Sequence, residues 1–231
     1  MNTFFLDRVN SEPHALAFAG QSTPWPVALA DQSANPALDE ALHTHAAAAQ
    51  ALLYPVSAEL LATTGRPVDL FGFEPNPARL GAAAAASASV PGIALTQLGA
   101  LLDAAALGYN PAQAKPVAVL GHSQGVLAVH MVQAICEAGS IDAAAAKIDE
   151  ILAIATLIGV AGTRQARQLG LAARHGEATP MLSVKDITRV QVDALIERVD
   201  GARGPIAVAV TNSATHYVLS GYPEDLAAFG V

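Results

Sequence analysis

Ser123 is the residue of this sequence whose type and surroundings point most clearly to chemistry. It is the middle residue of the motif Gly-His-Ser-Gln-Gly at residues 121–125, between a predicted buried strand at residues 117–120 and a helical apolar pattern at residues 126–134. A G-x-S-x-G motif in this position makes a sharp turn and exposes the serine hydroxyl at the amino end of a helix, whose dipole favours negative charge. Ser123 is therefore predicted to be a covalent nucleophile, and the alternative interpretation is an ordinary glycine-rich turn.

A serine nucleophile needs hydrogen-bond donors for the oxyanion that forms when it attacks a carbonyl. The backbone N–H of Gln124, the residue after the serine, is the expected first donor. Residues 15–20 are a short apolar run ended by glycine, which is typical of a buried strand. The loop after this strand is the expected source of the second donor, at Gln21, and the alternative for Gln21 is a solvent-exposed turn residue.

Helices are expected to surround these two strands. Residues 35–61 are rich in alanine and leucine and contain no glycine, which predicts helices. Residues 80–107 are helical in propensity with an expected break at residues 90–92, where a proline and a glycine occur. A further helix is predicted over residues 143–160, ending at the glycines of residues 159–162.

From about residue 176 onward the pattern changes to short strands and short helices. The expected elements are a strand, a helix, two strands and a helix, at residues 181–184, 188–199, 206–210, 216–220 and 223–229. A ferredoxin-like unit has the order β-α-β-β-α-β. The sequence therefore predicts such a unit without its last strand, as in a piece of a longer polypeptide.

Four segments together resemble the acyltransferase domain at the amino end of type I fatty acid synthases. The resemblance is closest to the single-chain actinobacterial synthases, and the fungal β-subunit is more distant. It covers nearly the whole chain and keeps the motifs in order. The segments are AFAGQ at residues 17–21, SVPGIALTQ at 89–97, GHSQGVLAV at 121–129 and LIGVAGT at 157–163.

This resemblance implies an α/β fold, with an α/β-hydrolase-like acyltransferase core over residues 1–175 and an inserted ferredoxin-like subdomain over residues 176–231, truncated at the carboxyl end. It implies transfer of an acetyl starter unit from acetyl-CoA, through an acyl-serine, to the phosphopantetheine thiol of an acyl carrier protein in fatty acid biosynthesis. The implied partners are CoA thioesters, the carrier protein and the rest of a fatty acid synthase, in a homo-oligomeric assembly. No cofactor is expected in this segment.

The resemblance also assigns roles to individual residues. Ser123 takes the acyl group, the backbone N–H groups of Gln21 and Gln124 form the oxyanion hole, and His122 shapes the elbow from behind. Asn212 falls where the family places an asparagine near the active site. The alternatives are a packing histidine for His122 and a turn residue at the end of a strand for Asn212.

Ile158 is the residue expected to set the acyl selectivity. Malonyl-selective relatives carry an arginine followed by a glycine at this place, where the guanidinium pairs with the malonyl carboxylate. An apolar side chain cannot neutralise a buried carboxylate, so acetyl is favoured over malonyl. Arg164, about one and a half turns further on, keeps malonyl open as an alternative, and a malonyl/palmitoyl-type transferase of the same family is the wider one.

The sequence departs from the family pattern in two places. Ser22 follows Gln21 where the family commonly has a glycine, which restricts the backbone beside the thioester. The catalytic histidine of the family follows the ferredoxin-like subdomain, at a place that falls beyond Val231. The sequence therefore predicts that residues 1–231 alone are inactive or nearly so, because Ser123 lacks its base.

Composition and charge limit the remaining possibilities. Hydrophobic residues make up 52 % of the 231 residues and charged residues 14 %, which excludes a disordered polymer. The net charge of −8 argues against nucleic-acid binding. Residues 164–203 nevertheless hold seven of the twelve basic residues, and this stretch is either a solvated helical face or a docking face for an acidic carrier protein.

The remaining expectations concern location and competing functions. A single cysteine, Cys136, excludes an internal disulfide, and without a secretory signal the cytoplasm is the expected compartment. No metal site is expected, and no membrane span, because Pro91 and Asp103 interrupt the apolar run at residues 81–108. The competing functions are a serine esterase or thioesterase and a non-catalytic assembly segment.

Overall fold

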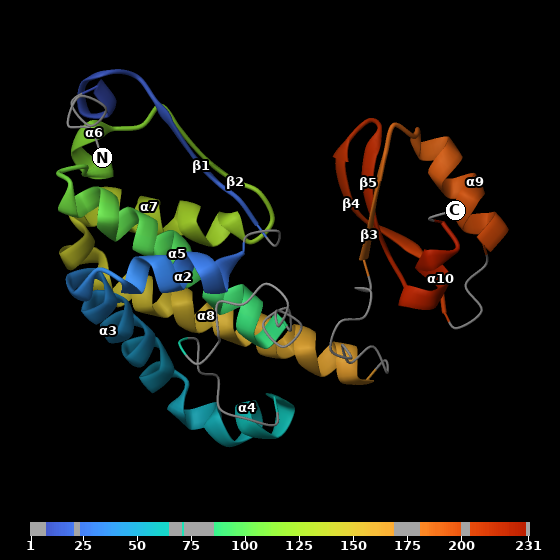
Figure 1. Ribbon diagram of the computed structural model, residues 1–231, viewed down its shortest axis with the longest axis horizontal. Helices are drawn as coiled ribbons and strands as arrows, with labels where there is room; N and C mark the ends of the chain where they lie inside the picture. Colours follow the sequence, from blue (N-terminus) through green and yellow to red (C-terminus); the bar gives the residue numbers. More distant parts are fainter. Residues whose placement is uncertain are drawn as a thin grey trace. The chain divides into compact units, whose positions relative to one another are not determined.

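The computed structural model describes residues 8–20, 24–64, 71, 86–168, 181–199 and 204–229 (Figure 1). Within these residues the chain is a mixed α/β protein in which helices predominate. It divides into two compact units, residues 1–166 and residues 167–231, here called the first unit and the second unit. The boundary predicted from the sequence, between residues 175 and 176, lies outside the described residues.

The first unit combines two short strands with a group of helices. Pro55 lies in a 3-10 turn that separates two of these helices, so the helical stretch predicted over residues 35–61 is divided there. The elements in chain order are β1 (Ala15–Phe18), α2 (Trp25–Ser33), α3 (Pro36–Leu52), η1 (Tyr54–Val56), α4 (Ser57–Thr64), α5 (Ala86–Ala106), α6 (Pro111–Ala114), β2 (Ala118–Gly121), α7 (Gly125–Ala138) and α8 (Ile141–Gln168).

Strand β1 lies parallel to β2, although about 100 residues separate them in the chain (Figure 1). Their register pairs Ala15 with Ala118 and Phe18 with Gly121. The backbone N–H of His122 then donates to the carbonyl oxygen of Phe18 at 3.0 Å, one residue beyond the end of β2. The pairing therefore brings the carboxyl end of β1 to the start of the serine motif.

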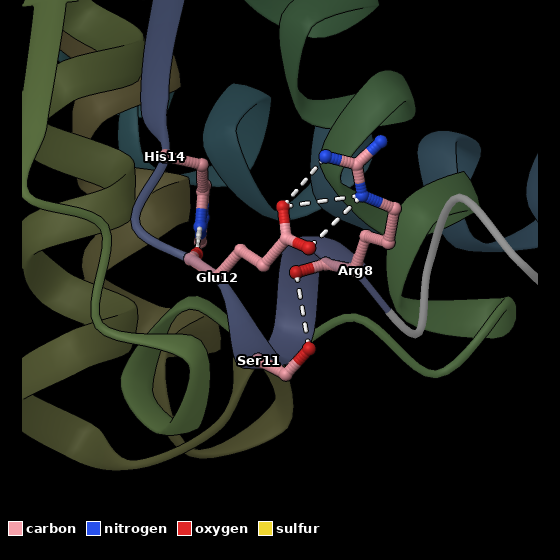
Figure 2. A network of polar contacts seen from close by, with 4 residues as sticks. All are labelled: Arg8, Ser11, Glu12 and His14. Carbon is pink, nitrogen blue, oxygen red and sulfur yellow. Dashed lines mark hydrogen bonds and ion pairs between the residues drawn. The ribbon is translucent and has the colours of Figure 1, made fainter.

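The residues before β1 form a local polar network (Figure 2). Arg8 pairs with Glu12 at 2.7 Å, and the His14 ring nitrogen Nδ1 lies 3.0 Å from the Glu12 carbonyl oxygen. Because a carbonyl oxygen only accepts, Nδ1 of His14 carries the proton, and Nε2 accepts from the Tyr109 hydroxyl at 2.9 Å. This contact ties the start of β1 to the segment between α5 and α6.

Helix α5 is the centre of the first unit, and it corrects the predicted break at residues 90–92. It packs against α2, α3 and α7 and runs without interruption through Pro91. A proline inside a helix costs about 3 kcal/mol, whereas full burial of each large aliphatic side chain contributes about 1.5–3 kcal/mol. Ile93, Leu95 and Leu98 are all fully buried, so packing outweighs the local cost. Gly92 lets the helix approach the indole ring of Trp25.

Helix α5 also corrects the expectation that the chain contains no segment of membrane-spanning length. Among the described residues, it is the one helix long and apolar enough to cross a membrane. However, 72 % of its apolar window is buried inside the protein, and the core helix of a globular domain passes the same test. The apolar stretch is uninterrupted because Pro91 does not end this helix.

Helix α8 is longer than the helix predicted over residues 143–160. It extends from Ile141 to Gln168 and continues through the two glycines that were expected to end it. A Cβ atom on Gly159 would overlap the carbonyl group of Ala86, and one on Gly162 would lie 3.2 Å from the Ala86 side chain. These glycines therefore permit close packing of α8 against the start of α5, rather than terminating the helix.

The second unit has the predicted β-α-β-β-α order. Its elements are β3 (Met181–Lys185), α9 (Arg189–Val199), β4 (Ala207–Ser213), β5 (His216–Ser220) and α10 (Pro223–Ala227). The strands form an antiparallel sheet in the order β3-β5-β4, and both helices lie on one side of it (Figure 1). The small core between them consists of buried Val192, Ile206, Tyr217, Leu219 and Leu226.

Candidate functional site

Ser123 lies in the turn between the end of β2 and the start of α7, as predicted. Its backbone φ is +54°, in the left-handed region that a residue with a side chain rarely adopts. Among the described non-glycine residues, only Lys115 and Asp186 share a positive φ. The predicted sharp turn at the serine is therefore confirmed, and the side chain is exposed at the amino end of α7.

Both glycines of the serine motif are required by close backbone contacts. A Cβ atom on Gly121 would overlap the backbone of Gly125, and one on Gly125 would overlap the carbonyl of Phe18. Gly20, after β1, makes a third close approach, because a Cβ there would lie 2.6 Å from the His122 carbonyl oxygen. Within the described residues the end of β1 is thus packed directly against the turn, which we call the elbow (residues 121–125).

Gln124 offers a backbone donor next to the serine. It is the N-cap residue of α7, and its own N–H donates no hydrogen bond to any described residue, whereas the N–H of Gly125 donates to His122. An N–H group at the amino end of a helix is suited to stabilising an anion. The oxygen Oε1 of the Gln124 side chain is buried and has no hydrogen-bond partner among the described residues.

The second expected donor, Gln21, lies outside the described residues, so its role stays a prediction. The residue before it, Gly20, is placed beside Ser123: a Cβ atom on Gly20 would lie 2.8 Å from the serine Cβ. His122 is exposed, and its backbone joins the elbow to β1 through its N–H. The structure therefore brings Ser123, His122 and Gln124 together with the end of β1.

Ile158 lies on α8 and is 51 % exposed. Ile154, one turn earlier on the same face, lines a groove of about 420 Å³ together with Val126 of the first turn of α7. Ile158 lies one turn beyond Ile154 and is not among the described residues that line this groove. Arg164, the alternative partner for a malonyl carboxylate, instead pairs with Glu59 at 3.0 Å, and both side chains are more than half exposed.

Asn212 lies on β4 in the second unit, where it belongs to a small polar cluster on the exposed side of the sheet. Its Nδ2 lies 3.4 Å from Nε2 of His216, and the same ring nitrogen lies 2.9 Å from the Ser183 hydroxyl. The cluster of Ser183, His216 and Asn212 was not anticipated from the sequence, because its members come from three strands and meet only through the sheet register.

Gln97 is a second residue that sequence reasoning left without a role. It is buried in α5, and its Nε2 donates to the carbonyl oxygen of Ala19, directly after β1. The available signal was a polar residue inside an otherwise apolar helical segment. The contact itself joins residues 78 positions apart, so no local pattern could have indicated it.

The part of the chain that the structure describes offers few other groups for metal binding or nucleophilic attack. No group of three or more His, Cys, Asp or Glu side chains in that part could hold a metal ion. Cys136 is a free thiol near the carboxyl end of α7. Burial, followed by the neighbouring charge of Glu137, raises the pKa of the Cys136 thiol. This thiol is therefore a poorer nucleophile at neutral pH than an ordinary cysteine.

Comparison with known proteins adds one finding to this geometry. A family model described as "Starter unit:ACP transacylase in aflatoxin biosynthesis" matches residues 74–230 of the chain. The matched region is more than half of the sequence and includes the elbow, Ile158 and Asn212, whereas β1 and Gln21 precede it. No match is found among curated proteins.

Proposed function

The chain belongs to the starter unit:ACP transacylase family, and from this membership we propose that Ser123 carries an acyl group from a CoA thioester to an acyl carrier protein. The observation that supports this most directly is the strained, exposed Ser123 at the amino end of α7. A general acyl transfer to a carrier protein is what the family description implies. The residue roles and the acyl group described below are finer proposals.

The proposed reaction has two steps through one covalent intermediate. Oγ of Ser123 attacks the thioester carbonyl, the C–S bond breaks, and the CoA thiol leaves with the proton that the serine lost. The phosphopantetheine thiol of the carrier protein then attacks the acyl-serine ester, which transfers the acyl group and returns the proton to Oγ. In both steps the backbone N–H groups of Gln124 and Gln21 stabilise the oxyanion.

The group that accepts the proton of the Ser123 hydroxyl is assigned only by the resemblance to type I synthases. No histidine ring hydrogen-bonds to the Ser123 hydroxyl among the described residues. The resemblance implies that a histidine accepts the proton of the Ser123 hydroxyl, since a serine without a base is a weak nucleophile at neutral pH.

We further propose acetyl as the transferred group. Ile158 is apolar and half exposed on α8, while Arg164 is paired with Glu59. Neither arrangement provides a cation for a malonyl carboxylate. The context of a fatty acid synthase, an oligomeric assembly and a cytoplasmic location remain proposals that follow from the resemblance to type I synthases.

The proposal is tested by intact-mass spectrometry of the protein after incubation with acetyl-CoA and, separately, malonyl-CoA. The expected result is an acetyl adduct that maps to Ser123 and disappears when a carrier protein with phosphopantetheine is added. An adduct lost equally fast in buffer without carrier would indicate a hydrolase. A malonyl adduct in place of the acetyl adduct would overturn the role given to Ile158.

A further inference from the structure

Gln97 combines deep burial with a polar contact to the segment beside the nucleophile. Its side chain is on α5, the residue is 8 % exposed, and its neighbours in the helix are mostly apolar. Its Nε2 lies 2.5 Å from the carbonyl oxygen of Ala19. Because that oxygen can only accept, the nitrogen of the amide must face it, which fixes the orientation of the amide group.

The contact controls the peptide that leaves β1. The carbonyl of Ala19 and the N–H of Gly20 belong to one planar peptide unit and point in opposite directions. Holding the oxygen therefore fixes the plane of the whole unit. Gly20 packs against the elbow so closely that a Cβ atom there would lie 2.8 Å from Cβ of Ser123 and 3.4 Å from the backbone nitrogen of Gln124.

We infer that Gln97 is a positioning residue for acyl transfer: its amide holds the Ala19–Gly20 peptide against the elbow, beside Ser123 and the backbone nitrogen of Gln124. The inference rests on the proposed function and adds a residue to it.

A purely structural role does not account for an amide at this position. Oε1 of Gln97 is buried and has no hydrogen-bond partner among the described residues, which costs free energy. A leucine would fill a similar volume without that cost. The amide is therefore explained by the one bond that it makes, to the peptide at the end of β1.

Gln32 provides a matched control in the same unit. It is on α2, its Nε2 donates to the Thr96 carbonyl oxygen of α5 at 2.9 Å, and its Oε1 is likewise buried without a partner among the described residues. It has the same chemistry and the same kind of bond, but it contacts a helix backbone instead of the peptide beside Ser123. Replacing it removes an equivalent hydrogen bond without touching the elbow.

The experiment compares Gln97→Leu and Gln32→Leu with the wild-type chain. Single-turnover acylation by acetyl-CoA is followed by intact mass over a range of CoA-ester concentrations, and thermal unfolding is measured for each variant. We expect Q97L to lower the maximal acylation rate at least about tenfold, without changing the CoA-ester concentration that gives half of that rate. Misplaced oxyanion donors slow the reaction of the bound ester but do not weaken its binding. Q32L should keep the wild-type rate.

A second variant tests the same contact without removing a polar group. In Gln97→Glu the carboxyl donates to Ala19 only when it is protonated, and burial raises the pKa of such a group. The acylation rate of Q97E relative to wild type is therefore expected to rise as the pH falls, which a loss of packing would not produce. This variant also serves if Q97L does not fold.

The outcomes distinguish a failure of the positioning role of Gln97 from a failure of the proposed acyl transfer. Equal acylation rates in wild type and Q97L, equal losses in Q97L and Q32L, or a Q97E ratio that does not change with pH would each overturn the positioning role alone. If the wild-type chain forms no adduct on Ser123 even with prolonged incubation and with imidazole added as an external base, the proposed function fails, and the role of Gln97 fails with it.

Discussion

Two serines of this molecule lie in opposite settings. Ser183 in the second unit is hydrogen-bonded to the ring of His216 at 2.9 Å, but it belongs to an ordinary antiparallel strand. Ser123 in the first unit has no side-chain partner among the described residues, yet it has a positive φ and lies at the amino end of a helix. A histidine partner alone does not make a nucleophile, because the attacked carbonyl also needs hydrogen-bond donors for its oxyanion, such as the N–H groups at the amino end of a helix.

The largest expected effect tests this comparison directly. Ser123→Ala should abolish the acyl adduct, because the hydroxyl that forms the ester is removed. Ser183→Ala should retain at least about half of the wild-type acylation rate, as a surface substitution away from the chemistry does. Intact mass after incubation with acetyl-CoA measures both. An adduct that moves to Ser183, or that survives in S123A, would reverse the assignment of the two serines.

The second expected effect concerns the backbone that strains Ser123. Gly125→Ala places a methyl group into the carbonyl of Phe18, and overpacking of this kind typically costs about 1–3 kcal/mol of stability. Acylation should fall with it, because β1 is displaced from the elbow. Gly139→Ala is the control at the other end of the same helix: its φ is +90°, but its Cβ would meet nothing within 4 Å.

Denaturant unfolding and acylation rates of both glycine variants separate crowding from backbone strain. G139A should lower the free energy of unfolding by about 1–2 kcal/mol, only because alanine must adopt a left-handed backbone conformation there. Its acylation rate should stay near that of wild type. If G125A acylates as fast as G139A, the close approach of β1 is not needed for the reaction.

A third effect concerns acyl selectivity at the elbow. Ile158→Arg should raise the rate of malonyl relative to acetyl acylation at least about tenfold, because a guanidinium pairs with the malonyl carboxylate. Leu52→Arg is the matched control, at the carboxyl end of α3, where Leu52 is as exposed as Ile158. Competition between the two CoA esters, read by intact mass, gives the ratio. Equal changes in I158R and L52R would show a general effect of charge and remove Ile158 from the site.

The smallest effect compares the two ends of α7. Ser123 precedes its amino end, whereas Cys136 lies near its carboxyl end with a thiol whose pKa is raised by burial and by Glu137. Iodoacetamide should therefore alkylate Cys136 more slowly than a free thiol at pH 8 and approach the free rate only at higher pH. Alkylation at the free-thiol rate at pH 8 would contradict the direction of this shift.

The same shift has a consequence for stability. A raised pKa in the folded state means that the thiol ionises first in the unfolded state as the pH rises. The contribution of Cys136 to the free energy of unfolding is therefore fully present below the ordinary thiol pKa of about 8.5 and is lost as the pH rises above that value. Cys136→Ser removes this dependence, and urea unfolding of the two proteins between pH 7 and pH 10 measures it.

The parts of the fold that were predicted correctly depend on neighbours in the chain. The order of strand, turn and helix around Ser123 and the β-α-β-β-α order of the second unit follow from short apolar runs and from glycine positions, which are local signals. The burial predicted for the strand before Ser123 is wrong, because Val117 and Leu120 are mostly exposed. The break at Pro91 and the end of α8 at Gly159 were predicted wrongly for the opposite reason. At both places contacts with distant segments, Trp25 and Ala86, decide the backbone.

The sequence by itself determined the identity of the nucleophile candidate, because G-x-S-x-G between a strand and a helix limits the backbone to a strained turn. Only the tertiary structure decided what lies against that turn. The parallel pairing of β1 with β2, the packing of Gly20 on Ser123 and the hydrogen bond from Gln97 to Ala19 join residues about 80 to 100 positions apart. Such contacts form because burying α5 together with the inward-facing side chains of the strands, Leu16, Phe18 and Val119, lowers the free energy, and no local pattern encodes them.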